Sequence, residues 1–283
     1  MKLIDAFRNK QDWEDAGFQI PLFDRTKVIE ETKKNPKWIH FGAGNIFRAL
    51  PAAVHQILLD KGHAAAGIIV AEGFDYEIID KVYTPYNNLS VLVVLKSDGT
   101  IEKKVIGSVV ESLKADAASP DWLSLQEIFI SSSLQMASFT ITEKGYSLVN
   151  AQGEYSVDVQ YDFEHGFNRP KNIMAKITSL CFKRFEAGAY PIALVSMDNC
   201  SHNGTKLYEA VLTIAKKWVE KGFCTEDFIG YIENSDKVSF PWSMIDKITP
   251  RPDSSVQKQL EKDGFLDTDI VITSKNTYTA PFV

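Results

Sequence analysis

The order of apolar and polar positions predicts alternating strands and helices along most of the chain. Short apolar runs that fit buried strands lie at 38–41, 67–73, 89–95, 101–110, 137–142, 191–197 and 269–273. Most of these runs are separated by helical patterns, which predicts a doubly wound, mostly parallel α/β sheet with helices on both faces. The exception is 89–110, where the turn at 96–100 predicts an antiparallel β insertion.

Apolar residues at helical spacing predict the helices between these strands. They cover 26–33, 46–61, 121–129, 171–187, 205–221, 225–233 and 254–262. In the second of these helices, one face collects Ile46, Leu50, Ala53, Val54, Ile57 and Leu58. Residues 147–169 are polar and predict a surface excursion. We expect residues 1–36 to form an N-terminal arm and residues 37–283 to form one domain.

The stretch 37–48 joins the first strong strand to its helix through a pair of glycines, Gly42 and Gly44. The first glycine permits a tight turn, and the second lets the backbone approach a pyrophosphate at the positive end of a helix. This order predicts a Rossmann-type dinucleotide-binding domain over 37–283. Phe47 stands where the usual fingerprint has a third glycine, so an ordinary glycine-rich turn remains an alternative.

The second strand ends on an acidic residue, Glu72, with Asp75 close behind it. In dinucleotide-binding units an acidic residue at this place accepts hydrogen bonds from the adenosine ribose. Such a carboxylate repels a 2′-phosphate, so the sequence favours NAD over NADP as the cofactor. The alternative for either residue is a charge that faces water at a strand end.

Composition excludes several classes of protein. The 283 residues are 45% hydrophobic and 24% charged with a net charge of −6, which gives no basic footprint for nucleic acid. No apolar run approaches the roughly 18 residues of a membrane span, and the N-terminus lacks a signal-peptide pattern. Cys181, Cys200 and Cys224 lack metal-ligand spacing and fit reduced thiols, so we expect a cytoplasmic protein without a metal site.

Four blocks of the chain together resemble the mannitol dehydrogenase family of polyol and hexuronate dehydrogenases. They are His40–Gly44 with Arg48, Thr142–Tyr146, Ser196–Gly204 and Phe240–Pro250. The resemblance covers roughly residues 37–283 and implies an NAD(P)-dependent oxidation of a secondary alcohol without a metal. The implied substrates are open-chain C6 polyols or sugar acids, as in mannitol to fructose or D-mannonate to D-fructuronate.

The family's general base is a lysine in a Lys-x4-Asn-x2-His motif on a helical C-terminal substrate domain. No such motif occurs in these 283 residues. We therefore expect the cofactor-binding part of such an enzyme, which binds cofactor, turns over little or nothing alone and is completed by a C-terminal substrate domain of the same protein. The alternative is a non-catalytic nucleotide-binding module or a partner subunit.

The resemblance also implies roles for single residues. Asn199 matches the asparagine that stabilises the developing charge on the reacting oxygen, although it could instead cap the following helix. Thr142 and Lys144 lie in the turn that would shape the nicotinamide pocket, and we expect Lys144 to be solvated or ion-paired and not to be the catalytic base. At the glycine turn, the expected cofactor-binding residues also include Asn45, Ile46 and Arg48, the last of which could instead form a surface salt bridge.

Two departures from the family pattern bear on the substrate. Trp242 stands where the fourth block usually has asparagine, and Asn45, Ile46 and Phe47 replace small residues after the glycines. These changes favour the hexuronate branch, with fructuronate or mannonate as substrate. His202 lies in the third block, where a structural role is the better interpretation.

Overall fold

A computed structural model describes all residues, 1–283, and it divides into two compact units. The first unit comprises residues 1–34, 43–112 and 247–283, and the second comprises 35–42 and 113–246. The predicted arm, 1–36, thus contributes nearly all of its residues to the first unit. None of the helices combines the length and the apolar character needed to cross a bilayer.

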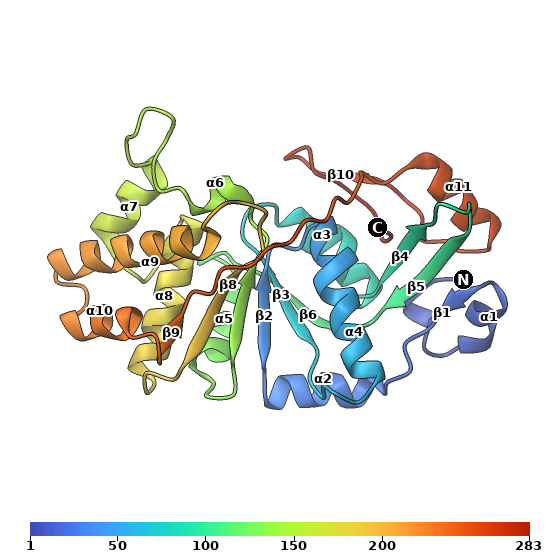
Figure 1. Cartoon of the computed structure of the whole chain (residues 1–283), viewed down its shortest axis with the longest axis horizontal. Helices are drawn as coiled ribbons and strands as arrows, with labels where there is room; N and C mark the ends of the chain where they lie inside the picture. Colours follow the sequence, from blue (N-terminus) through green and yellow to red (C-terminus); the bar gives the residue numbers. More distant parts are fainter. The chain divides into compact units, whose positions relative to one another are not determined.

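The main sheet has six strands in the order β6-β3-β2-β7-β8-β9. Its strands are β2 (Trp38–Phe41), β3 (Ile68–Glu72), β6 (Val109–Lys114), β7 (Met136–Phe139), β8 (Ile192–Ser196) and β9 (Val238–Ser239). The pairs β2–β7, β7–β8 and β8–β9 are parallel. Together with the helices around it (Figure 1), this sheet confirms the predicted mostly parallel, Rossmann-type α/β fold.

The first unit also holds two small sheets, in the orders β1-β5-β4 and β10-β11. Their strands are β1 (Phe18–Gln19), β4 (Ser90–Leu95), β5 (Ile101–Ile106), β10 (Val271–Ile272) and β11 (Tyr278–Thr279). The β4–β5 pair is antiparallel, which confirms the predicted insertion. The helical segments of this unit are η1 (Leu3–Asp5), α1 (Lys10–Asp15), α2 (Arg25–Lys34), α3 (Asn45–Phe47), η2 (Arg48–Ala52), α4 (Ala53–Asp60), η3 (Ile79–Tyr83), η4 (Thr84–Tyr86) and α11 (Ser254–Lys262).

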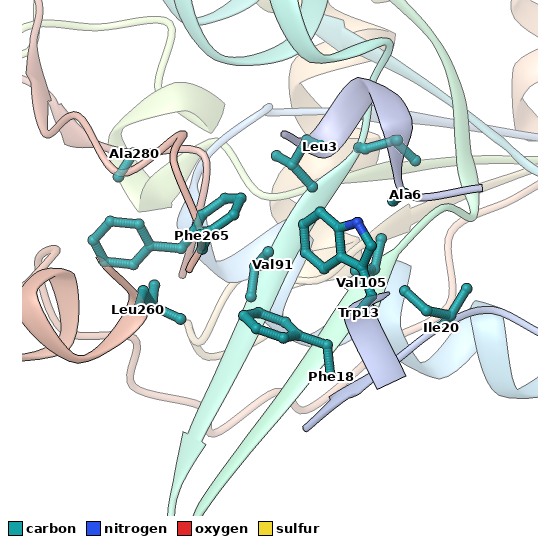
Figure 2. Close-up of a cluster of buried hydrophobic side chains, with 12 residues drawn as sticks. Leu3, Ala6, Trp13, Phe18, Ile20, Val91, Val105, Leu260, Phe265 and Ala280 are labelled. Atoms are coloured by element: carbon teal, nitrogen blue, oxygen red, sulfur yellow. The ribbon is translucent and has the colours of Figure 1, made fainter. Parts of the chain in front are cut away.

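The core of the first unit joins segments from both ends of the chain (Figure 2). Its buried members are Leu3, Ala6, Trp13, Phe18, Ile20, Leu89, Val91, Val105, Leu260, Phe265, Ala280 and Phe282. The Trp13 and Phe18 rings meet edge to face, with centroids 4.9 Å apart. The last residue, Val283, exchanges two 2.8 Å backbone hydrogen bonds with Val91 and Val93 of β4. Aromatic burial of this kind dominates core energetics, so the N-terminal segment is an integral part of this unit.

The second unit packs its helices around β7 and β8, with α8, α9 and α10 next to one another (Figure 1). Its helices are α5 (Asp121–Ile130), α6 (Thr142–Tyr146), α7 (Val157–His165), α8 (Ile173–Glu186), α9 (Asn203–Glu220) and α10 (Glu226–Glu233). The apolar side of α8 is buried as its spacing predicts, and the fully buried Arg184 donates to the carbonyls of Phe129, Leu134 and Pro191.

Two predictions about helices were wrong. The stretch 147–169 contains α7, whose N-cap Ser156 accepts a hydrogen bond from the N–H of Val159. The helix after the glycine turn exists, but its predicted apolar face is the outer one, because Val54 and Ile57 are about half exposed at 50% and 49%. Its inner face includes His55, Gln56 and Leu59, and Gln56 bonds the backbone of Val105 and Gly107.

Candidate functional site

The glycine turn begins where β2 ends, and Gly42 is required there by the packing of the second unit. Its φ is +110°, a conformation that residues with a side chain rarely adopt. A Cβ at this position would lie 2.2 Å from the carbonyl oxygen of Thr140, which follows β7. The Thr140 N–H in turn donates to the carbonyl of Phe41 at 2.9 Å. The first glycine thus permits close approach between the ends of two parallel strands.

The second glycine, Gly44, is in a different situation within the first unit. Its φ of −73° suits any residue, and a Cβ here would meet no atom within 4 Å. It is the N-cap of an uninterrupted helical stretch made of α3, the π-helical turn η2 and α4. The first N–H groups of a helix lack partners within it, so Asn45 and Ile46 carry backbone donors beside this open space. The turn therefore has the room and the donors that a phosphate group needs.

Glu72, at the end of β3, faces this turn with its carboxylate. Its Oε2 accepts from the N–H of Ala43 at 2.8 Å, and its Oε1 accepts from the N–H groups of Phe74 and Asp75 at 2.8 and 3.1 Å. The side chain is buried, so both oxygens are engaged within the protein. The Tyr83 hydroxyl donates to the carbonyl of Ala43 at 3.0 Å.

Asp75 and Arg48, also predicted for the cofactor, contact the segment 271–280 in the first unit. The Oδ2 atom of Asp75 accepts from the hydroxyls of Thr273 and Thr277, both at 2.6 Å. Arg48 is buried, donates to the carbonyl of Ala280 at 2.6 Å, and its Nε has no partner. These contacts replace the surface salt bridge considered for Arg48, and a contact between Arg48 and pyrophosphate stays a prediction.

The side chain of Asn45 belongs to the same network. Its Oδ1 accepts from Arg48 Nη2 at 2.8 Å, and its Nδ2 donates to the carbonyl of Tyr278 at 3.2 Å. The structure thus brings the predicted residues Glu72, Asp75, Asn45 and Arg48 into bonded networks around the glycine turn.

The second unit holds a polar cluster at the carboxyl ends of β7 and β8, centred on Asp198. Its carboxylate accepts from the N–H groups of Ile141 and Thr142, both at 2.9 Å, and from the Tyr146 hydroxyl at 2.6 Å. Burial raises the pKa of Tyr146, and the negative charge of Asp198 raises it further, so this hydroxyl remains a donor. Thr142 has a φ of +65°, an outlier for a β-branched residue. Strained residues of this kind cluster at functional sites.

Asn199, the predicted catalytic residue, follows Asp198 directly and is exposed. The helix α9 begins after His202, so Asn199 is not its cap and the alternative role is not what the structure shows. Its carboxamide makes no hydrogen bond within the chain, whereas that of Asn203 donates to the carbonyls of Asp198 and Ser243 at 3.1 and 2.9 Å. The Asn199 side chain is therefore free to contact a ligand while its backbone surroundings are fixed.

Lys144 is exposed on α6, beside a hollow of about 630 Å³ that also has Tyr155, Lys206 and Glu209 in its wall. In that wall, Lys206 and Glu143 form an ion pair.

The His202 ring lies edge to face against the Trp242 ring, with the ring centroids 4.6 Å apart, which suits the structural role expected for His202. No group of three or more His, Cys, Asp or Glu side chains in the chain is arranged to hold a metal ion.

Sequence reasoning missed Asp198, Tyr146 and Tyr83 as members of these networks. Asp198 and Tyr146 lie in motif blocks that were recognised, but nothing in their spacing shows that the carboxylate binds the turn after β7. Tyr83 lies forty residues from Ala43 in a stretch without a motif, so only the fold brings the two together.

A family model described as the mannitol dehydrogenase Rossmann domain matches residues 36–268. The chain is 49% identical over 279 residues to the D-mannonate oxidoreductase of Thermotoga maritima, covering 99% of this chain and 51% of that protein. It is 26% identical over 275 residues to the polyol:NADP oxidoreductase of Gluconobacter oxydans, covering 92% of this chain and 51% of that protein. The chain spans about half the length of the curated relatives it matches.

Among solved structures, the chain resembles Pseudomonas fluorescens mannitol 2-dehydrogenase in its ternary complex with NAD and D-mannitol. The TM-score is 0.76 at 24% identity, over 100% of this chain and 53% of the other, which shows a shared fold. The family model matches well over half of the residues, including the glycine turn, Glu72 and Asp198. The chain therefore belongs to the mannitol dehydrogenase family, of which it carries the Rossmann domain.

Proposed function

We propose that this chain is the NAD-binding part of an oxidoreductase that interconverts a secondary alcohol and a ketone on an open-chain sugar acid or polyol. The observation that carries the proposal is the open space over Gly44, at the start of the helical stretch from Asn45 to Asp60. Its backbone angles do not require glycine, so the absence of a side chain is explained by a group that must approach the backbone.

The residues of the first unit fit a dinucleotide. Gly44 and the backbone N–H groups of Asn45 and Ile46 would hold the pyrophosphate, as other helix N-termini hold phosphate groups. Asp75 supports NAD over NADP, because its carboxylate near the end of β3 would repel a 2′-phosphate. Arg48 would add positive charge behind the turn.

Bound NAD would supply the acceptor for a hydride from the carbinol carbon of the substrate. Asn199 would donate a hydrogen bond to the reacting oxygen and stabilise its developing negative charge, and Thr142 and Lys144 would border the nicotinamide pocket. The proton of the alcohol would pass to a lysine of a C-terminal substrate domain of the same protein. The greater length of the relatives supports this expectation.

For the substrate we infer D-mannonate and D-fructuronate ahead of mannitol and fructose. The 49% identity to a protein named D-mannonate oxidoreductase supports this order, as does Trp242 in the fourth motif block. The three cysteines are free thiols, which suits the cytoplasmic location that is part of the proposal.

Calorimetric titration of the chain with NAD+ and, separately, with NADP+ tests the cofactor assignment. The proposal predicts measurable binding of NAD+ and clearly weaker binding of NADP+. The substrate assignment requires the complete protein, in which NADH oxidation should be faster with D-fructuronate than with fructose. Faster turnover of fructose would place the protein in the mannitol branch.

A further inference from the structure

Ala43, which lies between the two glycines, is held through both of its backbone polar groups. Its N–H donates to Glu72 Oε2 at 2.8 Å, and its carbonyl accepts from the Tyr83 hydroxyl at 3.0 Å. Ala43 is completely buried, so neither group has water as an alternative partner. The two side chains thus fix the peptide groups on both sides of Ala43 within the first unit.

Both carboxylate oxygens of Glu72 accept hydrogen bonds from backbone N–H groups. Besides Ala43, the carboxylate binds the N–H groups of Phe74 and Asp75 through Oε1, and only 6% of the residue is exposed. Hydrogen bonds from backbone N–H groups to a carboxylate are stronger than neutral ones. Glu72 therefore joins the end of β3 to the glycine turn instead of projecting toward solvent.

Tyr83 holds the next peptide group, between Ala43 and Gly44, through its carbonyl. It ends the π-helical turn η3 and is only 1% exposed. Burial raises the pKa of Tyr83, so its hydroxyl stays protonated and acts as a donor. Short π-helical turns such as η3 are frequent at functional sites.

We propose that Glu72 and Tyr83 are positioning residues that clamp Ala43 and thereby hold Gly44 and the first N–H groups of the helix in a phosphate-binding arrangement. The inference rests on the proposed dinucleotide function and deepens it. It assigns Glu72 a task different from binding the ribose: the residue acts on the cofactor through the turn. Glu72 thus sets the affinity for both cofactors and does not discriminate between them.

Amide hydrogen exchange of the free protein over residues 41–47 tests the clamp without any cofactor. In Glu72→Gln, the amide NH2 cannot accept, so one of the backbone donors loses its partner. We expect exchange about tenfold faster in this segment. Tyr83→Phe removes the second contact with little change of shape and should also speed exchange. Glu77→Gln, on the same connection after β3, keeps an oxygen for its bond from the N–H of Ser274 and should match the wild type.

Titration of the same variants with NAD+ and NADP+ tests the consequence for binding. Glu72→Gln and Tyr83→Phe should each lower the affinity for NAD+ and for NADP+ by about tenfold or more, with the ratio of the two affinities unchanged. If Glu72→Gln raises the affinity for NADP+ relative to that for NAD+, the carboxylate faces the ribose and the inference is overturned. Unchanged exchange in both clamp variants would do the same. If the wild type binds neither cofactor, the proposed function fails, while the exchange rates still decide whether the clamp exists.

Discussion

The two glycines of the turn are equivalent in the sequence but not in the structure. Gly42 has a positive φ and approaches the carbonyl of Thr140, so the fold itself excludes a side chain. Gly44 has ordinary backbone angles and open space around it, so the fold tolerates a side chain there. A Gly-x-Gly pattern predicts a turn, but it does not show which glycine serves the chain and which serves a ligand.

Thermal or urea unfolding of two alanine variants separates these roles. Gly42→Ala should lower the free energy of unfolding by about 2–4 kcal/mol, because the new Cβ collides with backbone and the φ is strained. Gly44→Ala should stay within about 0.5 kcal/mol of the wild type. An equal loss of unfolding free energy in both variants would contradict the assignment of Gly44 to a ligand.

His40 gives the second unit a pH dependence that its sequence position in β2 does not reveal. The ring is fully buried, with Nδ1 2.7 Å from the Ser138 hydroxyl and Nε2 2.9 Å from the Thr140 hydroxyl. Burial, opposed by a hydrogen bond with the backbone of Gly42, lowers the pKa of His40 to about 3. The folded protein therefore keeps this ring neutral where the unfolded chain binds a proton.

The sign of the effect follows from proton linkage. Below about pH 6.5 the unfolded state binds more protons, so stability falls as the pH is lowered toward 3, by up to about 1.4 kcal/mol per pH unit from this residue. Urea unfolding between pH 4 and 7 should show a shallower dependence for His40→Gln than for the wild type. His63→Gln, which alters an exposed histidine, should keep the wild-type dependence. An unchanged slope in His40→Gln would contradict the buried neutral state.

Among the elements, long segments with a clear period were predictable and irregular ones were not. The helix α11 was predicted with its observed bounds, 254–262, and in the structure the side chain of Asp253 caps it by accepting from the N–H of Ser255. The helix α7 was missed, because its buried side consists of Val159, Asp162 and Phe163, and a buried aspartate hides the apolar period. The wrong face was chosen for α4, because its buried side carries two polar residues, His55 and Gln56, that are bonded to backbone.

The connection between β7 and α6 depends on one carboxylate, which no periodicity predicts. Asp198 binds the N–H groups of Ile141 and Thr142, and these bonds help to hold the left-handed conformation of Thr142. Asp198→Ala should lower the free energy of unfolding by about 1–3 kcal/mol, because two backbone N–H groups and the Tyr146 hydroxyl lose their charged acceptor. It should also speed amide exchange over 141–146. Asp236→Ala, at an exposed turn, is the matched control, and a loss in both variants would argue against a specific role of Asp198.

At the scale of the whole molecule, the sequence predicted the family and the sheet better than the arrangement of side chains. Four motif blocks indicated the mannitol dehydrogenase family, which the family model and the relatives confirm. The predicted residues at the glycine turn could be placed at the end of a strand, because parallel sheets expose loops there. Their contacts with segment 271–280 join residues some two hundred positions apart, and no local pattern encodes such contacts.

The proposed pyrophosphate site of NAD is the turn from Gly44 to Ile46. The most direct measurement is calorimetric titration of NAD+ into the wild type and into Gly44→Val, with the unfolding midpoint of both proteins measured alongside. The structure predicts that the wild type binds NAD+, that the valine fills the open space and abolishes binding, and that the unfolding midpoint changes little. Undiminished binding of NAD+ by a folded Gly44→Val protein would contradict the account.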